Sequence, residues 1–473
     1  MSILLPKSVQ ADINVKNGFA LKKRKPLAVV LRWDEDWEEG LTLINGKGSL
    51  ILDFGKEMNG GIRIITGVVD GNSTQARIRF GESRSEIETE IGYKNATNDH
   101  SPRDFMATIS GFSNVVLGET GFRYVRIDFL ENKKVFIQNI FCINKMLSKH
   151  AKWIYNGADA KIGDIFKTAK RTVDLCVTDK YVVDGVKRDR LVWIGDMHPE
   201  MLALTTLYGR VAQIENSLDF MREVTPNGCW MNGVYSTYSM WWIIIVADYY
   251  WATNCIDFVK KQFTYINQLL KQFNDYVSDD GTLNYPTYFV DWQTSSSVDL
   301  CMGVRAINIL AVNKAKKLLQ EFGGETKEAE KLLEKLMKKP INPQEMKQVV
   351  ALKYFALGEI NDNEYQLLIK DGAKGMSTFM SYYILTAIAS RDRTLAVEIM
   401  KEYYGGMLAK GATTFWEDFN IEWIENSCRI DELPKEGEKD IHGDFGDYCY
   451  KGFRHSLCHG WSSGVIKFIK ENC

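Results

Sequence analysis

The sequence predicts two structural parts, an N-terminal antiparallel β-sandwich over residues 1–150 and an all-helical domain over residues 151–473. Three observations lead to this prediction: strand-like runs between turn residues in the first part, helical spacing of apolar residues after it, and very few strand signals beyond residue 150. The chain of 473 residues is long enough for two domains, since a typical domain has ~100–200 residues.

The β prediction depends on short runs bounded by Gly, Asn or Asp, which lie at 48–54, 61–66, 74–80 and 122–130. In the third run, Ala76, Ile78 and Phe80 alternate with Arg77 and Arg79. This period of two is typical of a strand with one buried face and one solvated face. Regularly spaced short strands with glycine-rich turns favour an antiparallel sandwich.

Beyond residue 150, apolar residues recur at the spacing of an α-helix. Ile162, Phe166, Ala169 and Val173 form one apolar stripe and predict a helix over 159–177. Further helices are predicted over 197–209, 236–254, 255–275, 297–322, 326–338, 343–357, 374–390, 392–405 and 462–471. Roughly a dozen helices without a heptad or an exact repeat favour a toroid of paired helices over a simple bundle.

Charge and composition exclude several classes of partner. The chain has 59 Lys and Arg against 61 Asp and Glu, so neither nucleic acid nor an anionic membrane is expected as its main partner. The apolar run at 241–247 is far shorter than the ~20 residues of a membrane span, so no span is expected. The aromatic content of 12% leaves two explanations open, large cores or a ligand with apolar faces such as a sugar.

The nine cysteines are scattered and include no C-x-x-C pair, which excludes a zinc knuckle and a thioredoxin motif. Unpaired thiols and the lack of signal-peptide character after Met1 lead us to expect a cytoplasmic location. His198 lies close to Asp196, but no His-x-x-x-His pair or clustered carboxylate spacing indicates a metal. We therefore expect neither a metal nor a cofactor.

The segment 184–196 lies between two predicted helices and combines carboxylates, guanidinium groups and an indole. Its members of this kind are Asp184, Arg188, Asp189, Arg190, Trp193 and Asp196. A carboxylate beside a cation is held ionised, whereas one desolvated against an indole is held protonated. This mixture suits general acid chemistry on a sugar acetal, and a surface loop with salt bridges is the alternative explanation.

Two later segments carry further candidate residues. In 413–419, Glu417 lies among aromatic residues, either as a general base or as a helix-terminal residue whose stem packs on Trp416. In 453–464, His459 is a candidate hydrogen-bond partner for a substrate hydroxyl. A Cys/His nucleophile is not expected there, because adjacent residues rarely hold both side chains in a reactive geometry.

Aromatic residues in the helical part are candidates for stacking against a sugar. Asp291 and Trp292 follow a group of aromatic residues in a predicted loop, and a Trp beside an Asp in a loop is typical of a ligand platform. Trp241 and Trp242 open an apolar helix. Trp242 is a candidate for the same role, although aromatic residues at helical spacing are usually part of a core.

Seven short motifs, in one order along the chain, resemble those of the α-L-rhamnosidases of glycoside hydrolase family 78. The family's acidic loop D-C-P-x-R-[DE]-R-x-G-W-x-G-D corresponds to 184–196, with matches at Asp184, Arg188, Arg190, Trp193, Gly195 and Asp196. Its T-T-x-W-E, G-D-W and N-H-x-x-x-G correspond to 413–417, 290–292 and 458–464. Its D-F-G-x-N-x-x-G, Y-G-E and G-F-R-Y correspond to 53–61, 80–82 and 121–124.

The resemblance implies a β-sandwich packed on an (α/α)6 barrel, and an exo-acting, inverting hydrolysis of terminal α-L-rhamnosides. It places the general acid at Asp189 and the general base at Glu417, which an inverting enzyme holds ~6.5–9.5 Å apart. It also implies a set of substrate-binding residues. These are Asp184 and Asp196 on sugar hydroxyls with Arg188 orienting them, Trp193 and Trp292 on the apolar ring face, His459 on a hydroxyl, and Asp291 and Trp242 beside them.

The sequence also departs from the family pattern. Asp189 replaces the usual Glu, Gly185 and Val186 replace Cys-Pro, Val192 replaces Gly, and Cys458 replaces Asn. We expect a carbohydrate substrate with a terminal L-rhamnose or a similar deoxyhexose.

Two alternatives to this function stay open. The shorter acid residue, Asp189, motivates a catalytically lapsed sugar-binding protein. The other alternative is a glycosidase of the same barrel type with a different substrate, such as a uronic-acid-linked oligosaccharide. The acidic stretch 422–447 disfavours a highly anionic ligand.

Overall fold

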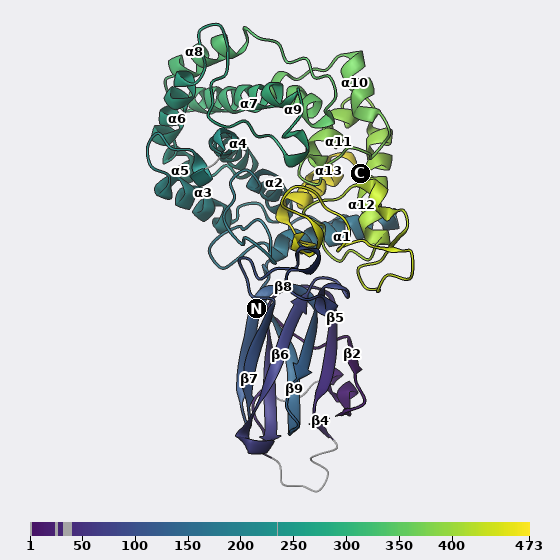
Figure 1. The fold of residues 1–473 in the computed structure, drawn as a ribbon. Helices are drawn as coiled ribbons and strands as arrows, with labels where there is room; N and C mark the ends of the chain where they lie inside the picture. The colour runs from purple at the N-terminus through teal and green to yellow at the C-terminus, as the bar shows by residue number, and fades with distance from the viewer. Residues whose placement is uncertain (1, 24–26, 32–39, 234) are drawn as a thin grey trace.

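The computed structural model describes residues 2–23, 27–31, 40–233 and 235–473. Strands occupy the chain up to Asn144, and helices begin at Ala160, so that a β domain projects from a larger helical domain (Figure 1). Residues 1, 24–26 and 32–39 of the predicted β part, and residue 234, lie outside the described residues.

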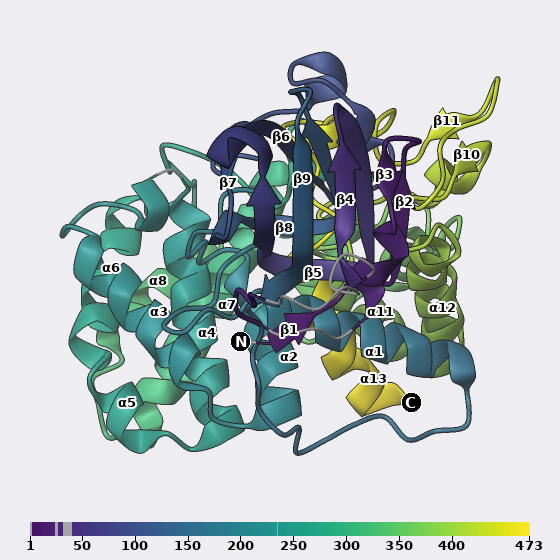
Figure 2. The same ribbon diagram turned by 90° about the horizontal axis from the view of Figure 1, so that it is seen from below.

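Nine strands of the β domain pair into one antiparallel sheet in the order β3-β4-β9-β5-β8-β6-β7, with β1 beside β9 and β2 beside β5. Their bounds are β1 Ser2–Leu4, β2 Ser8–Ala11, β3 Val15–Lys16, β4 Thr42–Asn45, β5 Gly48–Val69, β6 Ser73–Gly81, β7 Asp104–Ser110, β8 Asn114–Phe129 and β9 Lys134–Asn144. The antiparallel prediction is confirmed, but these strands form one continuous curled sheet in place of two separate sheets (Figure 2).

The long strand β5 makes the sheet continuous. Its first half pairs with β2 and β8, and its second half pairs with β8 and β9. The predicted runs 48–54 and 61–66 are therefore two halves of one strand. Register shifts near Asp53 and Gly60 mark the place where β5 bends.

The alternation in β6 determines how this domain is packed. Ala76, Ile78 and Phe80 are buried in the core, where the Phe80 ring meets the Phe122 ring edge-on at 4.9 Å. The opposite face is less solvated than the pattern predicts, because Arg79 is also buried and donates to Asp128 at 2.7 Å. A buried guanidinium requires such a partner.

The helical domain contains thirteen α-helices among the described residues. They are α1 Ala160–Leu175, α2 Met197–Tyr208, α3 Ala212–Val224, α4 Ser236–Thr253, α5 Ile256–Lys260, α6 Phe263–Asp275, α7 Leu300–Glu321, α8 Lys327–Leu336, α9 Lys347–Leu357, α10 Asp362–Ile369, α11 Ser381–Ala389, α12 Arg393–Ala409 and α13 Val465–Asn472. The predicted ranges do not include α3 and α10, and the predicted helix 255–275 is divided into α5 and α6.

Six of these helices follow one another around a closed ring. In turn, α2 contacts α4, α4 contacts α7, α7 contacts α9, α9 contacts α11, α11 contacts α13, and α13 contacts α2 again. Helix α4 is buried on almost all sides, as expected for an inner helix. By contrast, α8 lies outside the ring and buries only one stripe, formed by Ala329, Leu332 and Leu336.

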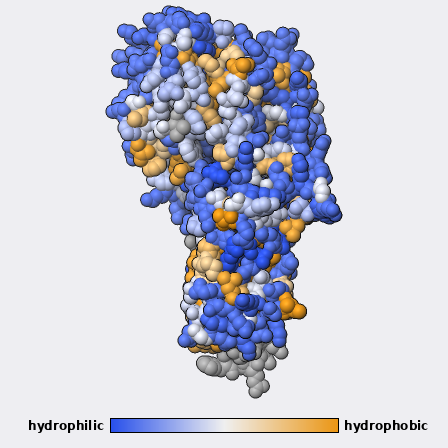
Figure 3. All heavy atoms as spheres, viewed as in Figure 1, coloured by the Kyte–Doolittle hydropathy of each residue, from blue (hydrophilic) through white to orange (hydrophobic). Residues whose placement is uncertain are grey.

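Most apolar side chains lie in two hydrophobic cores, one in the β domain and one in the helical domain. The face of the molecule shown in Figure 3 is mainly hydrophilic, with small separate apolar groups. None of the helices in the described ranges is both long enough and apolar enough to cross a membrane.

Connections between the helices meet the β domain at one end of the ring (Figure 1). The Glu57 amide donates to Thr413 Oγ1 at 2.9 Å, and Arg454 Nε lies 3.1 Å from Asp99 Oδ2. The loop residue Lys187 contacts Glu86 at 2.8 Å. The segments 184–196 and 413–464 are therefore fixed against the sheet as well as against the helices.

Replacement of Phe80 by Ala tests the packing of the β domain. We expect the free energy of unfolding of this domain to fall by about 3–5 kcal/mol, because the ring is fully buried among other aromatic side chains. Urea unfolding followed by circular dichroism measures the change. The control is Met106→Ala on the exposed face of β7, with an expected effect within about 0.5 kcal/mol; equal effects would contradict the assignment of this core.

Candidate active site

Side chains from three connections between helices, at 180–196, 284–297 and 413–464, meet at a cavity of about 130 Å³ at the end of the ring. Its lining residues are Asp184, Arg188, Asp189, Trp193, Asp196, Tyr235, Tyr238, Trp292, Glu417, Cys449, Tyr450, His459 and Trp461. Eight of the ten residues predicted from the sequence are among them, and Trp242 and Asp291 are not.

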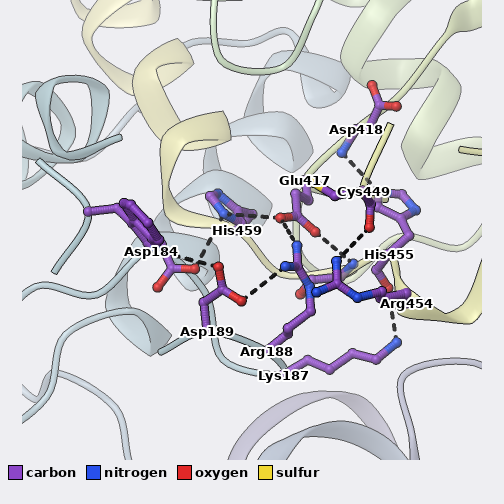
Figure 4. A network of polar contacts seen from close by, with 12 residues as sticks. Asp184, Lys187, Arg188, Asp189, Glu417, Asp418, Cys449, Arg454, His455 and His459 are labelled. Atoms are coloured by element: carbon purple, nitrogen blue, oxygen red, sulfur yellow. Dashed lines mark hydrogen bonds and ion pairs between the residues drawn. The ribbon is translucent and has the colours of Figure 1, made fainter. Parts of the chain in front are cut away.

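The guanidinium of Arg188 connects two carboxylates of the cavity. Its Nη2 lies 2.5 Å from Glu417 Oε1, and its Nη1 lies 3.0 Å from Asp189 Oδ1 (Figure 4). Burial alone lowers the pKa of Arg188, but the neighbouring Glu417 and Asp189 outweigh burial and raise it, so the group stays charged. Arg188 therefore contacts Glu417 and Asp189 directly.

The backbone at Asp189 has an uncommon conformation. Asp189 has φ 53° and Arg190 has φ 58°, so two consecutive non-glycine residues lie in the left-handed region. Asp tolerates this region better than most residues, because its short polar side chain can bond locally. Such a turn aims the Asp189 carboxylate back at its own loop, where Trp193 Nε1 donates to Oδ2 at 3.2 Å.

The β domain also reaches Asp189. His100, in the connection before β7, has its Nε2 3.3 Å from Asp189 Oδ1 and is partly open to solvent. Sequence reasoning missed this residue, since nothing in its local pattern indicates that it lies beside a loop of the other domain.

Glu417 is fixed by its backbone as well as by Arg188. Its amide donates to the Ser456 carbonyl at 3.0 Å, and the Ser456 amide donates back to Glu417 Oε2 at 3.1 Å. The Glu417 carbonyl accepts from Trp461 Nε1 at 3.0 Å. A carboxylate that is 3% exposed and held by these contacts has a defined position and keeps one edge on the cavity.

Asp184 and Asp196 form a buried acidic wall of the cavity. Burial, then repulsion by Asp196 and Asp189, raises the pKa of Asp184 well above its ordinary value. Burial, then repulsion by Glu417 and Asp189, does the same to the pKa of Asp196. A raised pKa favours the protonated form of each carboxyl group, in which it can both donate and accept hydrogen bonds.

His459 lies among three of these carboxylates. Its Nε2 is 3.6 Å from Glu417 Oε1, 3.7 Å from Asp184 Oδ2 and 3.8 Å from Asp196 Oδ2. Burial, with a smaller effect from the Arg188 charge, lowers the pKa of His459 to about 3. The imidazole is therefore neutral and does not act as a counter-ion for the carboxylates.

Aromatic side chains form the rest of the wall. Trp193 meets Tyr238 edge-on at 6.0 Å, Trp292 meets Tyr450 edge-on at 5.9 Å, and Trp461 lies 4.2 Å from the His459 ring. Tyr238 and Tyr450 are not among the predicted site residues, because both lie in segments whose aromatic residues suit a core equally well. A cavity with aromatic walls and convergent polar groups is typical of a small-molecule binding site.

Two predicted site residues lie elsewhere. Trp242 is fully buried, donates from Nε1 to the Leu218 carbonyl at 3.0 Å and packs edge-on against Tyr265, so it is part of the helical core. Asp291 accepts from the Trp292 amide at 2.7 Å and from the Ser377 hydroxyl, and burial raises its pKa to about 6. Asp291 fixes the turn that presents Trp292 to the cavity.

Within the described part of the chain, Glu82, Glu86 and His442 are one set with metal-ligand spacing, with ligand atoms within 4.8 Å of one another. The Lys187 ammonium lies 2.8 Å from the Glu86 carboxylate and 3.4 Å from that of Glu82. Two of these three groups therefore already have a cation of the protein itself as a partner.

Comparison with solved structures finds similar architectures. A rhamnosidase from Klebsiella oxytoca with rhamnose bound has a TM-score of 0.73 and 16% identity, over 99% of this chain and 95% of that one. The GH78 family rhamnosidase of Bacillus sp. GL1 has a TM-score of 0.71 and 18% identity, over 95% of this chain. The chain has the fold of the family 78 rhamnosidases. This confirms the resemblance in fold that the seven motifs predict.

The rhamnosidase fold is shared with larger proteins too. The α-L-rhamnosidase of Streptomyces avermitilis, complexed with L-rhamnose, matches with a TM-score of 0.63 and 14% identity over 89% of this chain. The chain spans 48% of the Bacillus rhamnosidase and 42% of the Streptomyces one. No protein-family model and no curated protein matches the sequence.

The buried acidic wall predicts a pH-dependent effect of Asp184→Asn on stability. Since the pKa of Asp184 is raised on folding, its contribution to stability is complete below the unfolded value near ~4 and is lost as the pH rises through the folded value. The variant is therefore expected to unfold at a higher urea concentration than the wild type at pH 8, with a difference that shrinks toward pH 4. Asn keeps an oxygen for the Leu191 amide, which donates to Asp184 Oδ1 at 2.8 Å.

The control for this measurement is Asp279→Asn, whose side chain is 94% exposed and for which no change is expected at either pH. An Asp184→Asn variant that is no more stable than the wild type at pH 8 would contradict the assignment of a strained, buried carboxyl.

Proposed function

We propose that the protein is an exo-acting, inverting glycoside hydrolase that releases a terminal α-L-rhamnose or a similar deoxyhexose. The observation that carries the proposal is the placement of Asp189 and Glu417 on two nitrogens of the same guanidinium, at the edge of one small aromatic cavity. The fold shared with rhamnosidases supports the same reaction class.

In this mechanism Asp189 is the general acid and Glu417 is the general base. Asp189 gives its proton to the glycosidic oxygen while the bond from that oxygen to the anomeric carbon breaks. Glu417 takes a proton from a water molecule, whose oxygen attacks the anomeric carbon from the opposite face. Arg188 contacts both carboxylates and holds them at the edge of the same cavity.

The cavity wall selects the substrate in this proposal. Trp193 and Trp292 face the apolar side of the sugar and its methyl group. Asp184 and Asp196, whose pKa values are raised, and neutral His459 bond to its hydroxyls. The small volume of the cavity favours a single terminal sugar unit over the interior of a polymer.

We also propose that the closed ring of helices is the inner layer of an (α/α)6 barrel and that the curled sheet is a distorted sandwich. The domains are then residues 1–150 and 151–473, with the active site at the end of the barrel that faces the sheet. The six successive ring contacts and the single continuous sheet support this description.

Neutral replacements of the two carboxylates test the assignment of acid and base. Asp189→Asn and Glu417→Gln are each expected to lower kcat on an aryl α-L-rhamnoside by about 10²–10⁴-fold, while circular dichroism and the unfolding midpoint stay close to those of the wild type. Asp279→Asn, an exposed carboxyl far along the chain, is the control with unchanged kcat. Full activity in Asp189→Asn or Glu417→Gln would contradict the role proposed for the replaced residue.

The stereochemistry of the first product is a separate prediction. Proton NMR during the first turnovers of an α-rhamnoside is expected to detect the β-anomer first, because attack from the face opposite the leaving group inverts the anomeric carbon. First release of the α-anomer would show a retaining mechanism instead. Binding of L-rhamnose with no hydrolysis of any aryl glycoside in a panel would favour a sugar-binding protein over an enzyme.

A further inference from the structure

We propose that the β domain positions the catalytic base, through two residues outside the cavity, Glu82 and Lys187. This inference rests on the proposed function only in naming Glu417 the base, because the contacts that hold Glu417 stand independently of the reaction. Glu82 belongs to the Phe80-Gly81-Glu82 motif, which the mechanism does not use.

Lys187 lies next to Arg188 but extends away from the cavity (Figure 4). Its ammonium donates to the carbonyls of Phe453 and His455, at 2.6 and 2.9 Å, and contacts Glu86 at 2.8 Å. The side chain is 8% exposed, so these contacts take the place of water. Lys187 therefore joins the acidic loop to the segment that precedes Ser456.

Glu82 continues this connection from the β domain. Its Oε2 accepts from the Leu457 amide at 2.7 Å, its Oε1 accepts from the Ser456 hydroxyl at 3.2 Å, and Lys187 lies 3.4 Å away. The Glu82 side chain is fully buried. A buried carboxylate with these partners keeps the backbone of Ser456 and Leu457 in one place, since loss of any partner would leave it unpaired.

The backbone so held is the one that fixes Glu417. The Ser456 amide donates to Glu417 Oε2, and the Glu417 amide donates to the Ser456 carbonyl. His455 accepts at its Nε2 from the Asp418 amide at 2.8 Å, so the next residue is bound to the same segment. Glu82 and Lys187 thus act on Glu417 through 453–457 and are positioning residues, since neither lines the cavity.

The position of Glu417 relative to Arg188 depends on both domains in this arrangement. A displacement of about 1 Å in a catalytic group can cost about 10²-fold in rate. Disruption of the connection should therefore lower turnover strongly, while the cavity walls that bind the sugar stay intact.

Matched substitutions distinguish the loss of the positioning contacts from changes in the size or charge of the side chain. Glu82→Leu removes both acceptor oxygens at nearly the same size, whereas Glu82→Gln keeps one acceptor for the Leu457 amide and a donor for the Ser456 hydroxyl. Lys187→Met removes the ammonium and keeps the length of the side chain. Glu90→Gln is the control, because Glu90 is an exposed carboxylate of the same domain that pairs with Arg77.

On an aryl α-L-rhamnoside, we expect Glu82→Leu and Lys187→Met to lower kcat by about 100-fold with KM changed by less than about threefold. Glu82→Gln should retain kcat within about fivefold of the wild type, and Glu90→Gln should equal it. A fall in thermal stability with unchanged kcat in Glu82→Leu and Lys187→Met would overturn the proposal, because it would assign the two residues a structural role only.

Hydrogen–deuterium exchange gives a readout that needs no substrate. Peptides that cover 453–460 should exchange at least about tenfold faster in Glu82→Leu and Lys187→Met than in the wild type, with β5 and α4 unchanged. Unchanged exchange at 453–460 would overturn the proposal even if activity fell. If the wild type hydrolyses no glycoside, faster exchange in this segment would still support the positioning, and only the proposed function would fail. If Glu82→Leu does not fold, Lys187→Met gives the same two readouts.

Discussion

A single buried cation holds the candidate active site together. Asp184, Asp189, Asp196 and Glu417 face one small cavity, and the guanidinium of Arg188 contacts two of them directly. Charges removed from water are costly unless they are paired or neutralised. Arg188 contacts Glu417 and Asp189, and burial raises the pKa values of Asp184 and Asp196, which favours their uncharged forms. The same constraint thus divides the four carboxyl groups into two that contact the guanidinium and two that do not.

Lys187 and Arg188 serve different parts of the molecule although they are adjacent. Arg188 connects the two candidate catalytic carboxylates, while Lys187 is surrounded by Glu82, Glu86 and backbone carbonyls at the boundary between the domains. The adjacent residues Lys187 and Arg188 therefore connect the sheet to the cavity. The β domain has no residue in the cavity lining, yet its buried Glu82 contacts the segment that holds Glu417.

Local pattern and motif spacing predicted much of this arrangement but not all of it. Helical spacing located most helices, and the acidic loop with Glu417 and His459 identified most of the cavity. However, Trp242 is part of the helical core, whereas Trp292 lines the cavity. A short-range sequence pattern does not show which of these two places a tryptophan side chain faces. His100 depends on contacts between distant segments, and the merging of two predicted runs into β5 depends on long-range strand pairing.

The closure of the ring by α13 against α2 has a consequence for how the protein is made. During synthesis α2 and α11 are made before α13, so the apolar faces that α13 covers lack this neighbour until residues 465–472 have been made. Glu82 is made before Lys187, and both are made before Ser456 and Leu457, which complete the contacts of Glu82. The active site can therefore assemble only once the segment 453–464 has been made, after every ring helix except α13.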